Sequence, residues 1–223
     1  AYESGTTAEF NNCFAPAWGR HRARIHPAPG NHEYESSTTA APYFAYFGDA
    51  AGPAARGYYS FNVGAWHIIS LNSNVSANAG SAQEQWLRAD LAANTAKCTL
   101  AFWHHALFSS GLHGSDPTMR DIWNALYDAG ADVVISGHDH DYERFAPQTA
   151  NGVADSDRGI REFVVGIGGR SLYPIIFVRP NSEKRLTTIF GILKLSLGPT
   201  DYQWTLIPAG GGPATDSGSG SCH

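Results

Sequence analysis

Five of the ten histidines in this 223-residue chain gather in three short segments that could bind a metal. His104 and His105 stand side by side, His138 and His140 fall in the run Gly-His-Asp-His, and His32 falls in Pro-Gly-Asn-His-Glu. Neutral imidazole nitrogens are common ligands of zinc, manganese and iron, so this clustering predicts a metal site. Polar turns with solvated histidines are the alternative that composition leaves open.

The spacing of these residues predicts which of them share a side. His138 and His140 are separated by one residue, so in an extended segment both imidazoles point the same way and can bind one metal or two neighbouring metals. His104 ends a strand-like run and can approach the same rim, whereas strict alternation predicts that His105 points the opposite way. We therefore expect at most one of this pair to be a ligand. Asn31 adds a carbonyl oxygen, which suits a mixed nitrogen and oxygen site.

Capping residues and hydrophobic patterns predict the elements that must position these side chains. A capping box beginning at Ser81 predicts a helix over 81–94, and Asp116 followed by Pro117 predicts a second helix over 117–129. The order of elements predicts a mixed α/β fold, in which histidines follow the carboxyl ends of strands. The predicted strands cover 57–63 and 66–71, which form a hairpin, and 100–103, 132–136, 162–165, 188–197 and 202–207.

Composition excludes several classes of protein. With 43% hydrophobic residues the chain can build a core, which excludes general disorder. The net charge of −5 without a basic stripe argues against nucleic-acid binding. The longest apolar run, residues 43–47, is far too short to span a membrane. We expect one domain over residues 1–208, followed by a flexible tail rich in Gly and Ser over 209–223.

In chain order, the histidine segments resemble a known family, the calcineurin-like metallophosphoesterases. The pattern is Gly-Asn-His-Glu at 30–33, then His104 after a strand, then Gly-His-Asp-His at 137–140. The longer stretch over 119–144, which ends in Asp-Tyr-Glu-Arg, resembles the purple acid phosphatase branch. The resemblance covers roughly residues 1–170. It implies an α/β/β/α sandwich with mixed sheets, of which the first strand or strands are missing from this chain.

The resemblance also implies two metal ions about 3.5 Å apart, a spacing shared by two-metal hydrolases. Asn31, His104 and His138 match the ligands of the divalent metal, which is zinc, manganese or iron. His140 matches a ligand of the second metal, usually ferric iron. Tyr2 matches the tyrosinate ligand of that iron if the chain begins inside the family motif Gly-Asp-x-x-Tyr, and an exposed terminal tyrosine is the alternative.

The sequence departs from the family pattern because it lacks the aspartates of the first two motifs. The first aspartate is Asp49, so none precedes Asn31. Without those carboxylates two metals held close together would repel each other, and we expect a single metal at Asn31, His104 and His138 in this chain by itself. The missing first strands also predict an unpaired sheet edge through which the chain could self-associate.

Two further histidines match residues that act on the substrate in this family. His32 matches the histidine that contacts phosphate oxygens, and His113, nine positions after His104, stands where a histidine often faces the leaving group. A histidine in a surface loop is the alternative for His113. Asp139 and Asp141 either support the ligands or face solvent. We interpret the remaining histidines as structural or surface residues, namely His21, His26, His67 and His223.

The resemblance implies a phosphomonoesterase of the purple acid phosphatase type, which hydrolyses a small phosphate ester with a metal-bound hydroxide. The alternatives are a phosphodiesterase or nucleotidase on the same fold, or a non-catalytic binding or assembly unit built from a truncated phosphatase domain. Such relatives are commonly exported, which predicts a secreted or periplasmic protein. The three cysteines allow one bridge and one free thiol, and a Cys13–Cys98 or Cys13–Cys222 bridge would agree with export.

Overall fold

The computed structural model describes residues 2–53 and 55–223. Most of its strands belong to one mixed sheet, made of β1 (Tyr59–Val63), β2 (Trp66–Ser70), β3 (Cys98–His105), β4 (Val133–Gly137), β5 (Tyr142–Phe145), β6 (Arg161–Val165) and β7 (Ser182–Leu186). Their order in space is β1-β2-β3-β4-β6-β5-β7. Strands β2, β3, β4 and β6 run parallel in the middle, and antiparallel pairs flank them on both sides.

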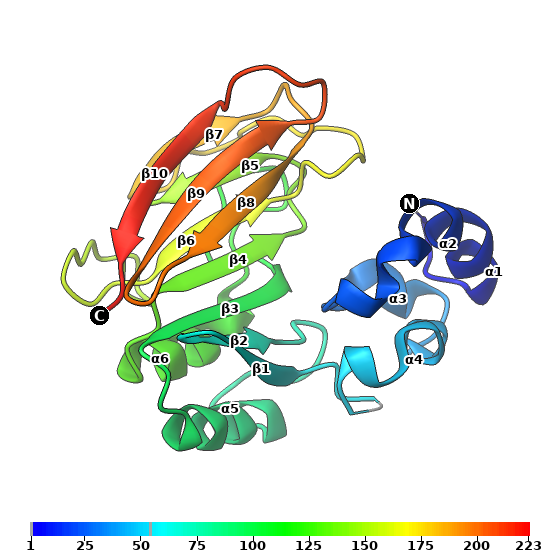
Figure 1. Ribbon diagram of the computed structural model, residues 1–223, viewed down its shortest axis with the longest axis horizontal. Helices are drawn as coiled ribbons and strands as arrows, with labels where there is room; N and C mark the ends of the chain where they lie inside the picture. The colour runs from blue at the N-terminus through cyan, green and yellow to red at the C-terminus, as the bar shows by residue number, and fades with distance from the viewer. Residues whose placement is uncertain (1, 54) are drawn as a thin grey trace.

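Two helices follow strands of the parallel part and cover one face of this sheet (Figure 1). They are α5 (Ala82–Ala93) and α6 (Arg120–Asp128), close to the predicted ranges. The Ser81 hydroxyl caps α5 by accepting a hydrogen bond from a backbone N–H in its first turn. Asp116 does the same for the 3₁₀ turn η4 (Pro117–Met119), which leads into α6.

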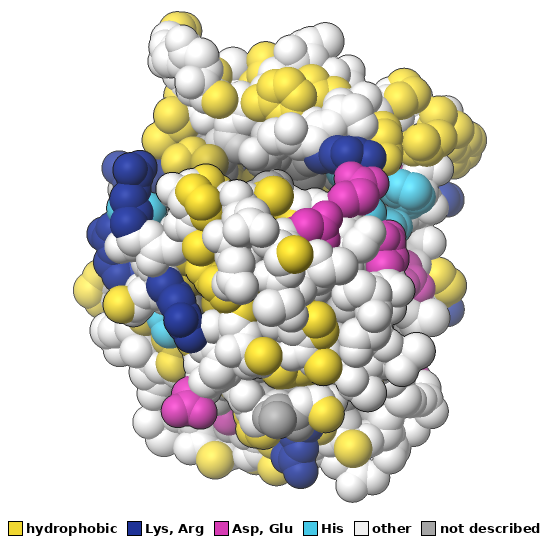
Figure 2. All heavy atoms as spheres, turned by 90° about the vertical axis from the view of Figure 1, so that its right-hand side faces the viewer, with side chains coloured by type: hydrophobic (Ala, Val, Ile, Leu, Met, Phe, Trp, Pro, Cys, Tyr) yellow, Lys and Arg dark blue, Asp and Glu magenta, His cyan; other side chains and the backbone are white. Residues whose placement is uncertain are grey.

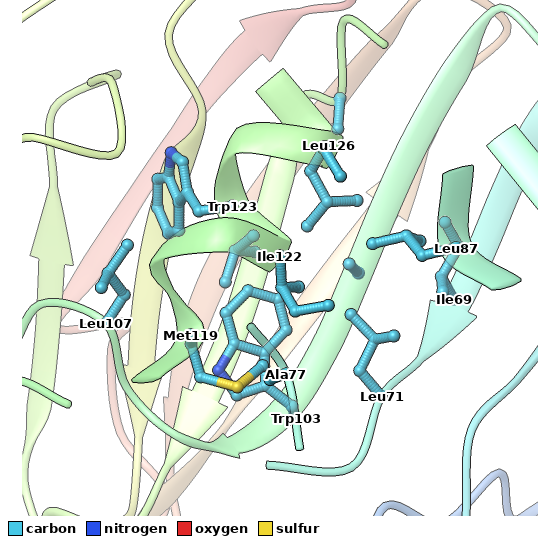
Figure 3. Packing of buried hydrophobic residues seen from close by; sticks show 14 of the residues in the cluster. Ile69, Leu71, Ala77, Leu87, Trp103, Leu107, Met119, Ile122, Trp123 and Leu126 are labelled. Atoms are coloured by element: carbon cyan, nitrogen blue, oxygen red, sulfur yellow. The ribbon is translucent and has the colours of Figure 1, made fainter. Parts of the chain in front are cut away.

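Packing between this helix layer and the sheet fixes the positions of the strand ends. Ile69 of β2 packs in one buried cluster with Leu87 of α5 and Leu126 of α6 (Figure 3). Ala101 of β3 and Val134 of β4 belong to the same cluster. Each buried aliphatic side chain of this size contributes roughly 1.5–3 kcal/mol. The cluster therefore holds the carboxyl ends of β3 and β4 firmly side by side.

A second, three-stranded antiparallel sheet packs on the other face of the first (Figure 1). Trp204 and Leu206 of this sheet lie in one buried cluster with Leu100 and Phe163 of the first. The expected mixed α/β class with two sheets is confirmed. In the order β10-β9-β8, the strands are β8 (Gly191–Leu197), β9 (Asp201–Pro208) and β10 (Asp216–Ser221).

The end of the chain corrects the prediction of a flexible tail over 209–223. Strand β10 lies within this range and pairs with β9 along its whole length. Its glycines meet a packing requirement, because a Cβ atom at Gly218 would lie 2.3 Å from the ring of Trp204. A Cβ atom at Gly220 would lie 2.5 Å from the ring of Tyr202. The glycines that suggested a flexible tail are therefore the residues that allow β10 to pack against the aromatic rings of β9.

A disulfide joins Cys98, the first residue of β3, to Cys222, directly after β10. Both bridges considered from the sequence involved Cys13, and both are wrong, because Cys13 is exposed and free. The two bonded residues are 124 positions apart, and only the assembly of the two sheets brings them together.

The N-terminal part forms a group of short helices beside the carboxyl ends of the strands (Figure 1). It packs around its own aromatic cluster, in which Phe10, Tyr43 and Phe47 are buried. Within the described residues, no helix is both long enough and apolar enough to cross a membrane. The helical segments are α1 (Thr7–Glu9), η1 (Phe10–Phe14), α2 (Ala15–Trp18), η2 (Gly19–Arg24), α3 (Asn31–Glu35), α4 (Ala41–Phe47) and η3 (Gly48–Ala51).

Candidate metal centre

Asn31 and His32 lie in the first turn of α3, a short helix whose N-terminus meets the strand ends. The Glu33 carboxylate accepts a hydrogen bond from the backbone N–H of Gly30 and so closes this end of the helix. A glycine is required at position 30, because a Cβ atom there would lie 2.8 Å from the His104 ring. This close approach lets Asn31 Oδ1 lie 2.8 Å from His104 Nε2.

His104 and His105 end β3, and both of their rings lie on the side of the site. Phe102 pairs with Ile135 of β4, but His105 pairs with Gly137, so β3 contains one extra residue between the two pairs. Such a bulge interrupts the alternation of side chains. The two imidazole centroids are consequently 4.9 Å apart, and the prediction that His105 points away from the site is wrong.

His138 follows β4 in the left-handed region, with φ of 68°. A non-glycine residue held there carries a conformational cost of about 1–3 kcal/mol, which the surrounding contacts must offset. His138 Nδ1 lies 3.1 Å from His104 Nε2. One nitrogen from each of His104, His105 and His138 lies within 4.8 Å of the other two. With Asn31, three nitrogens and one oxygen therefore meet at the strand ends.

Burial makes these imidazoles neutral. It lowers the pKa of His104 well below the ordinary value, and the neighbouring histidines lower it further. It also lowers the pKa of His138 to about 4 and the pKa of His105 below its usual value. Neutral imidazole is the form that binds a metal. Three neutral nitrogens and an amide oxygen therefore fit zinc, manganese or ferrous iron.

A cleft of about 380 Å³ contains two other predicted site residues, His32 and His140. Figure 2 shows this side of the molecule, where histidine side chains reach the surface beside acidic and basic ones. His140 stacks on Tyr173 with ring centroids 4.1 Å apart, and its Nδ1 lies 2.7 Å from the carbonyl oxygen of Ser171. An Nδ1–H that donates to this carbonyl leaves Nε2 free for a metal. The cleft is lined by Tyr2, Glu3, His32, His140, Gly169 and Arg170.

Tyr2 lines the same cleft but is not an exposed terminal residue. Its ring packs against Phe10, with centroids 4.7 Å apart. Burial raises the pKa of Tyr2, and the charge of Glu33 raises it further, so the phenol is protonated in this structure. Its assignment as an iron ligand stays a prediction.

His113 lies in the loop after β3, and its ring centroid is 4.2 Å from that of His138. Asp139 determines the shape of this loop, because its carboxylate accepts hydrogen bonds from the N–H groups of His113 at 2.7 Å and Gly114 at 3.1 Å. The Ser109 hydroxyl donates to the same carboxylate. Asp139 is buried, so of the two roles left open for it, facing solvent is excluded.

Further buried carboxylates lie behind this loop, and sequence reasoning did not single out two of them, Glu143 and Glu162. Glu143 accepts hydrogen bonds from the N–H and hydroxyl of Ser110, and Glu162 accepts one from the N–H of Phe108. Asp141 is also buried, and burial together with two neighbouring carboxylates raises its pKa to about 7. The alternation of acidic residues at 139, 141 and 143 is a signal that could have predicted acidic side chains grouped on one side of an extended segment.

Two of the histidines interpreted as structural or surface residues have such roles. His67 is buried, with Nδ1 2.7 Å from Asn62 Oδ1 and Nε2 2.8 Å from Asp90 Oδ2. His26 is exposed on one side and stacks on Phe61 with centroids 3.8 Å apart.

Comparison with known proteins identifies the family. The family model of the calcineurin-like phosphoesterases matches residues 4–142, which is more than half of the chain. The chain belongs to this family. The resemblance inferred from the motifs is confirmed, and the family is one of phosphoesterases.

Individual relatives point to the purple acid phosphatase-like branch. An uncharacterized protein of Mycobacterium tuberculosis is 32% identical over 200 residues, covering 70% of this chain and 38% of the relative. Purple acid phosphatase 15 of Arabidopsis thaliana is 33% identical over 127 residues, covering 52% of this chain and 24% of the relative. A purple acid phosphatase from yellow lupin (Lupinus luteus) seeds shares the fold, with a TM-score of 0.77 and 20% identity over 88% of this chain and 38% of that one. The chain spans less than two fifths of the length of these relatives.

Proposed function

We propose that the complete protein hydrolyses phosphate monoesters at a metal centre of the purple acid phosphatase type. The observation that carries this proposal is the convergence of Asn31 Oδ1, His104 Nε2 and His138 Nδ1, joined by distances of 2.8 and 3.1 Å. These donors would hold a divalent zinc, manganese or iron ion. His140 and Tyr2, which line the neighbouring cleft, would hold a ferric ion.

The bound metals would supply Lewis acidity and an activated water near neutral pH, as in other two-metal phosphoesterases. The chain's own residues would orient the ester and move protons. The His32 side chain is 37% exposed in the cleft and can donate a hydrogen bond to a phosphate oxygen. His113, beside His138, can protonate the departing alkoxide as a general acid.

A non-catalytic binding unit is the second candidate function. The observation that favours it is the absence of a carboxylate from the imidazole cluster among the described residues. Two metals held close together need anionic ligands to offset their charge. A chain that holds one metal at this donor set would lack the second Lewis acid of a two-metal hydrolase.

The test measures hydrolysis of an aryl phosphate monoester and of a bis-aryl phosphate diester by the metal-loaded protein. We expect turnover of the monoester, and we expect His138→Ala to abolish it because one metal ligand is lost. His26→Ala is the matched control, since His26 lies on Phe61 outside the site. A strong preference for the diester would overturn the monoesterase assignment. Metal binding without any turnover would favour the non-catalytic unit.

We also propose that the protein works outside the cytoplasm, as a secreted or periplasmic protein. The Cys98–Cys222 disulfide supports this, because structural disulfides persist mainly in oxidising compartments. Thiol labelling of the protein in its source cells tests the proposal. Recovery of only the reduced form, from the cytoplasm, would contradict it.

A further inference from the structure

We propose that His105 is an additional ligand of the metal held by Asn31, His104 and His138. This inference rests on the proposed metal centre and names a residue that neither the motif order nor the family pattern assigned. The chain would then offer three imidazole nitrogens and one amide oxygen to a single metal ion.

The first support is the position of the ring. A nitrogen of His105 lies within 4.8 Å of ligand nitrogens of both His104 and His138, which is close enough for the three to share one ion after small side-chain rotations. The ring centroid of His105 is 4.4 Å from that of His138. The bulge in β3 produces this arrangement, because a regular strand would turn one of two adjacent residues away.

The second support is the hydrogen bond that orients the ring. His105 Nδ1 lies 2.8 Å from the Ser73 hydroxyl oxygen, and the backbone N–H of His105 donates to the same oxygen at 3.0 Å. When Nδ1–H donates to Ser73, the lone pair of Nε2 is free to bind a metal. Histidine ligands are commonly fixed in this way, with the second ring nitrogen donating to a neighbouring oxygen.

The third support is the number of donors. Asn31, His104 and His138 provide three. A zinc ion bound by a protein usually takes four ligands in all. His105 would supply a fourth.

The experiment titrates chelator-treated protein with Co²⁺ and follows the visible absorption of the bound ion. His105→Phe keeps an aromatic ring beside His138 but removes the ligand nitrogens. His26→Phe is the matched control, because His26 stacks on Phe61 outside the site. We expect one Co²⁺ per wild-type chain, a loss of affinity of at least about 10-fold for His105→Phe, and an unchanged affinity for His26→Phe.

X-ray absorption of the zinc-loaded wild type provides a measurement that needs no variant. Three imidazoles around zinc would support the inference, and two would overturn it. Wild-type Co²⁺ affinity in His105→Phe would also overturn it, while leaving the proposed function intact. A wild-type protein that binds no Co²⁺ would overturn both the inference and the proposed metal centre.

Discussion

Glu162 is a carboxyl group that the folded chain holds in its interior. Its side chain is fully buried, and it accepts hydrogen bonds from the Phe108 N–H and the Ser136 hydroxyl, both at 3.1 Å. Burial raises the pKa of Glu162 from the ordinary 4.5 to about 8, because these hydrogen bonds compensate only partly for the lost hydration. At neutral pH the folded chain therefore keeps this group protonated.

We expect Glu162 to make stability fall as pH rises. Between the two pKa values the folded chain retains a proton that the unfolded chain has released, so the free energy of unfolding decreases by at most about 1.4 kcal/mol per pH unit. Glu162→Gln, which is neutral throughout, should flatten this decrease. Urea midpoints between about pH 5 and pH 8 measure it. Asp49→Asn, which changes an exposed carboxyl group, is the control. If the unfolding free energy of wild type and of Glu162→Gln changed equally with pH, the argument from burial would be wrong.

At the scale of residues, the sequence correctly predicted several of the side chains that lie together. It did not predict all of the residues that surround them. Asn31, His104 and His138 come from three distant segments, and their side chains meet as the motif order implied, although their role as ligands stays a prediction. His105 could not be predicted in the same way. The direction of its side chain depends on the bulge where β3 pairs with β4. The alternation of residues within one strand gives no information about that pairing.

At the scale of elements, the loop after β3 depends on the single carboxylate of Asp139. We expect Asp139→Asn to loosen the loop, because the NH₂ of the amide replaces one of the two oxygens that accept from His113 and Gly114 and directs a donor at one of these N–H groups. Leaving one of these donors unsatisfied should cost about 1–3 kcal/mol of stability, speed hydrogen exchange over 109–114, and lower turnover if His113 donates a proton. Exchange mass spectrometry measures the loosening. Asp116→Asn, at the other end of the loop, is the control and should leave exchange over 109–114 unchanged. Unchanged exchange in Asp139→Asn would show that the loop does not depend on Asp139.

Elements were predictable where a single segment carries its own signal. Ser81 and Asp116 begin their helices as their capping patterns predicted, since a cap acts within a few residues. Strands β5, β7 and β10 were missed. The polar run Ser-Glu-Lys-Arg-Leu of β7 is a strand only because β5 pairs with it, and β10 is ordered by the rings of β9. Such partners lie too far away in sequence to be seen in the segment itself.

At the scale of the whole molecule, the Cys98–Cys222 disulfide closes a loop of 124 residues. In the chain-entropy model, a cross-link over this length stabilises the folded state by about 4–5 kcal/mol. We expect the double variant Cys98→Ala, Cys222→Ala to unfold roughly 10 °C lower in scanning calorimetry. Cys13→Ala, at the exposed free thiol, should leave the transition unchanged. An unaltered transition in the double variant would mean that the disulfide adds nothing to the packing of β10.

The same disulfide divides the candidate ligands into two sets. His104, His105, His138 and His140 lie inside the covalent ring that it closes, whereas Asn31 belongs to an N-terminal arm with its own aromatic cluster. A metal shared by Asn31 and the histidines would link the N-terminal segment to the part of the chain that the disulfide encloses. The hydroxyls of Tyr59 and Ser70 donate to the carbonyl oxygen of Pro27, and the Asn74 amide donates to that of Pro29. Loss of the metal would therefore remove one of several connections and leave the N-terminal segment attached.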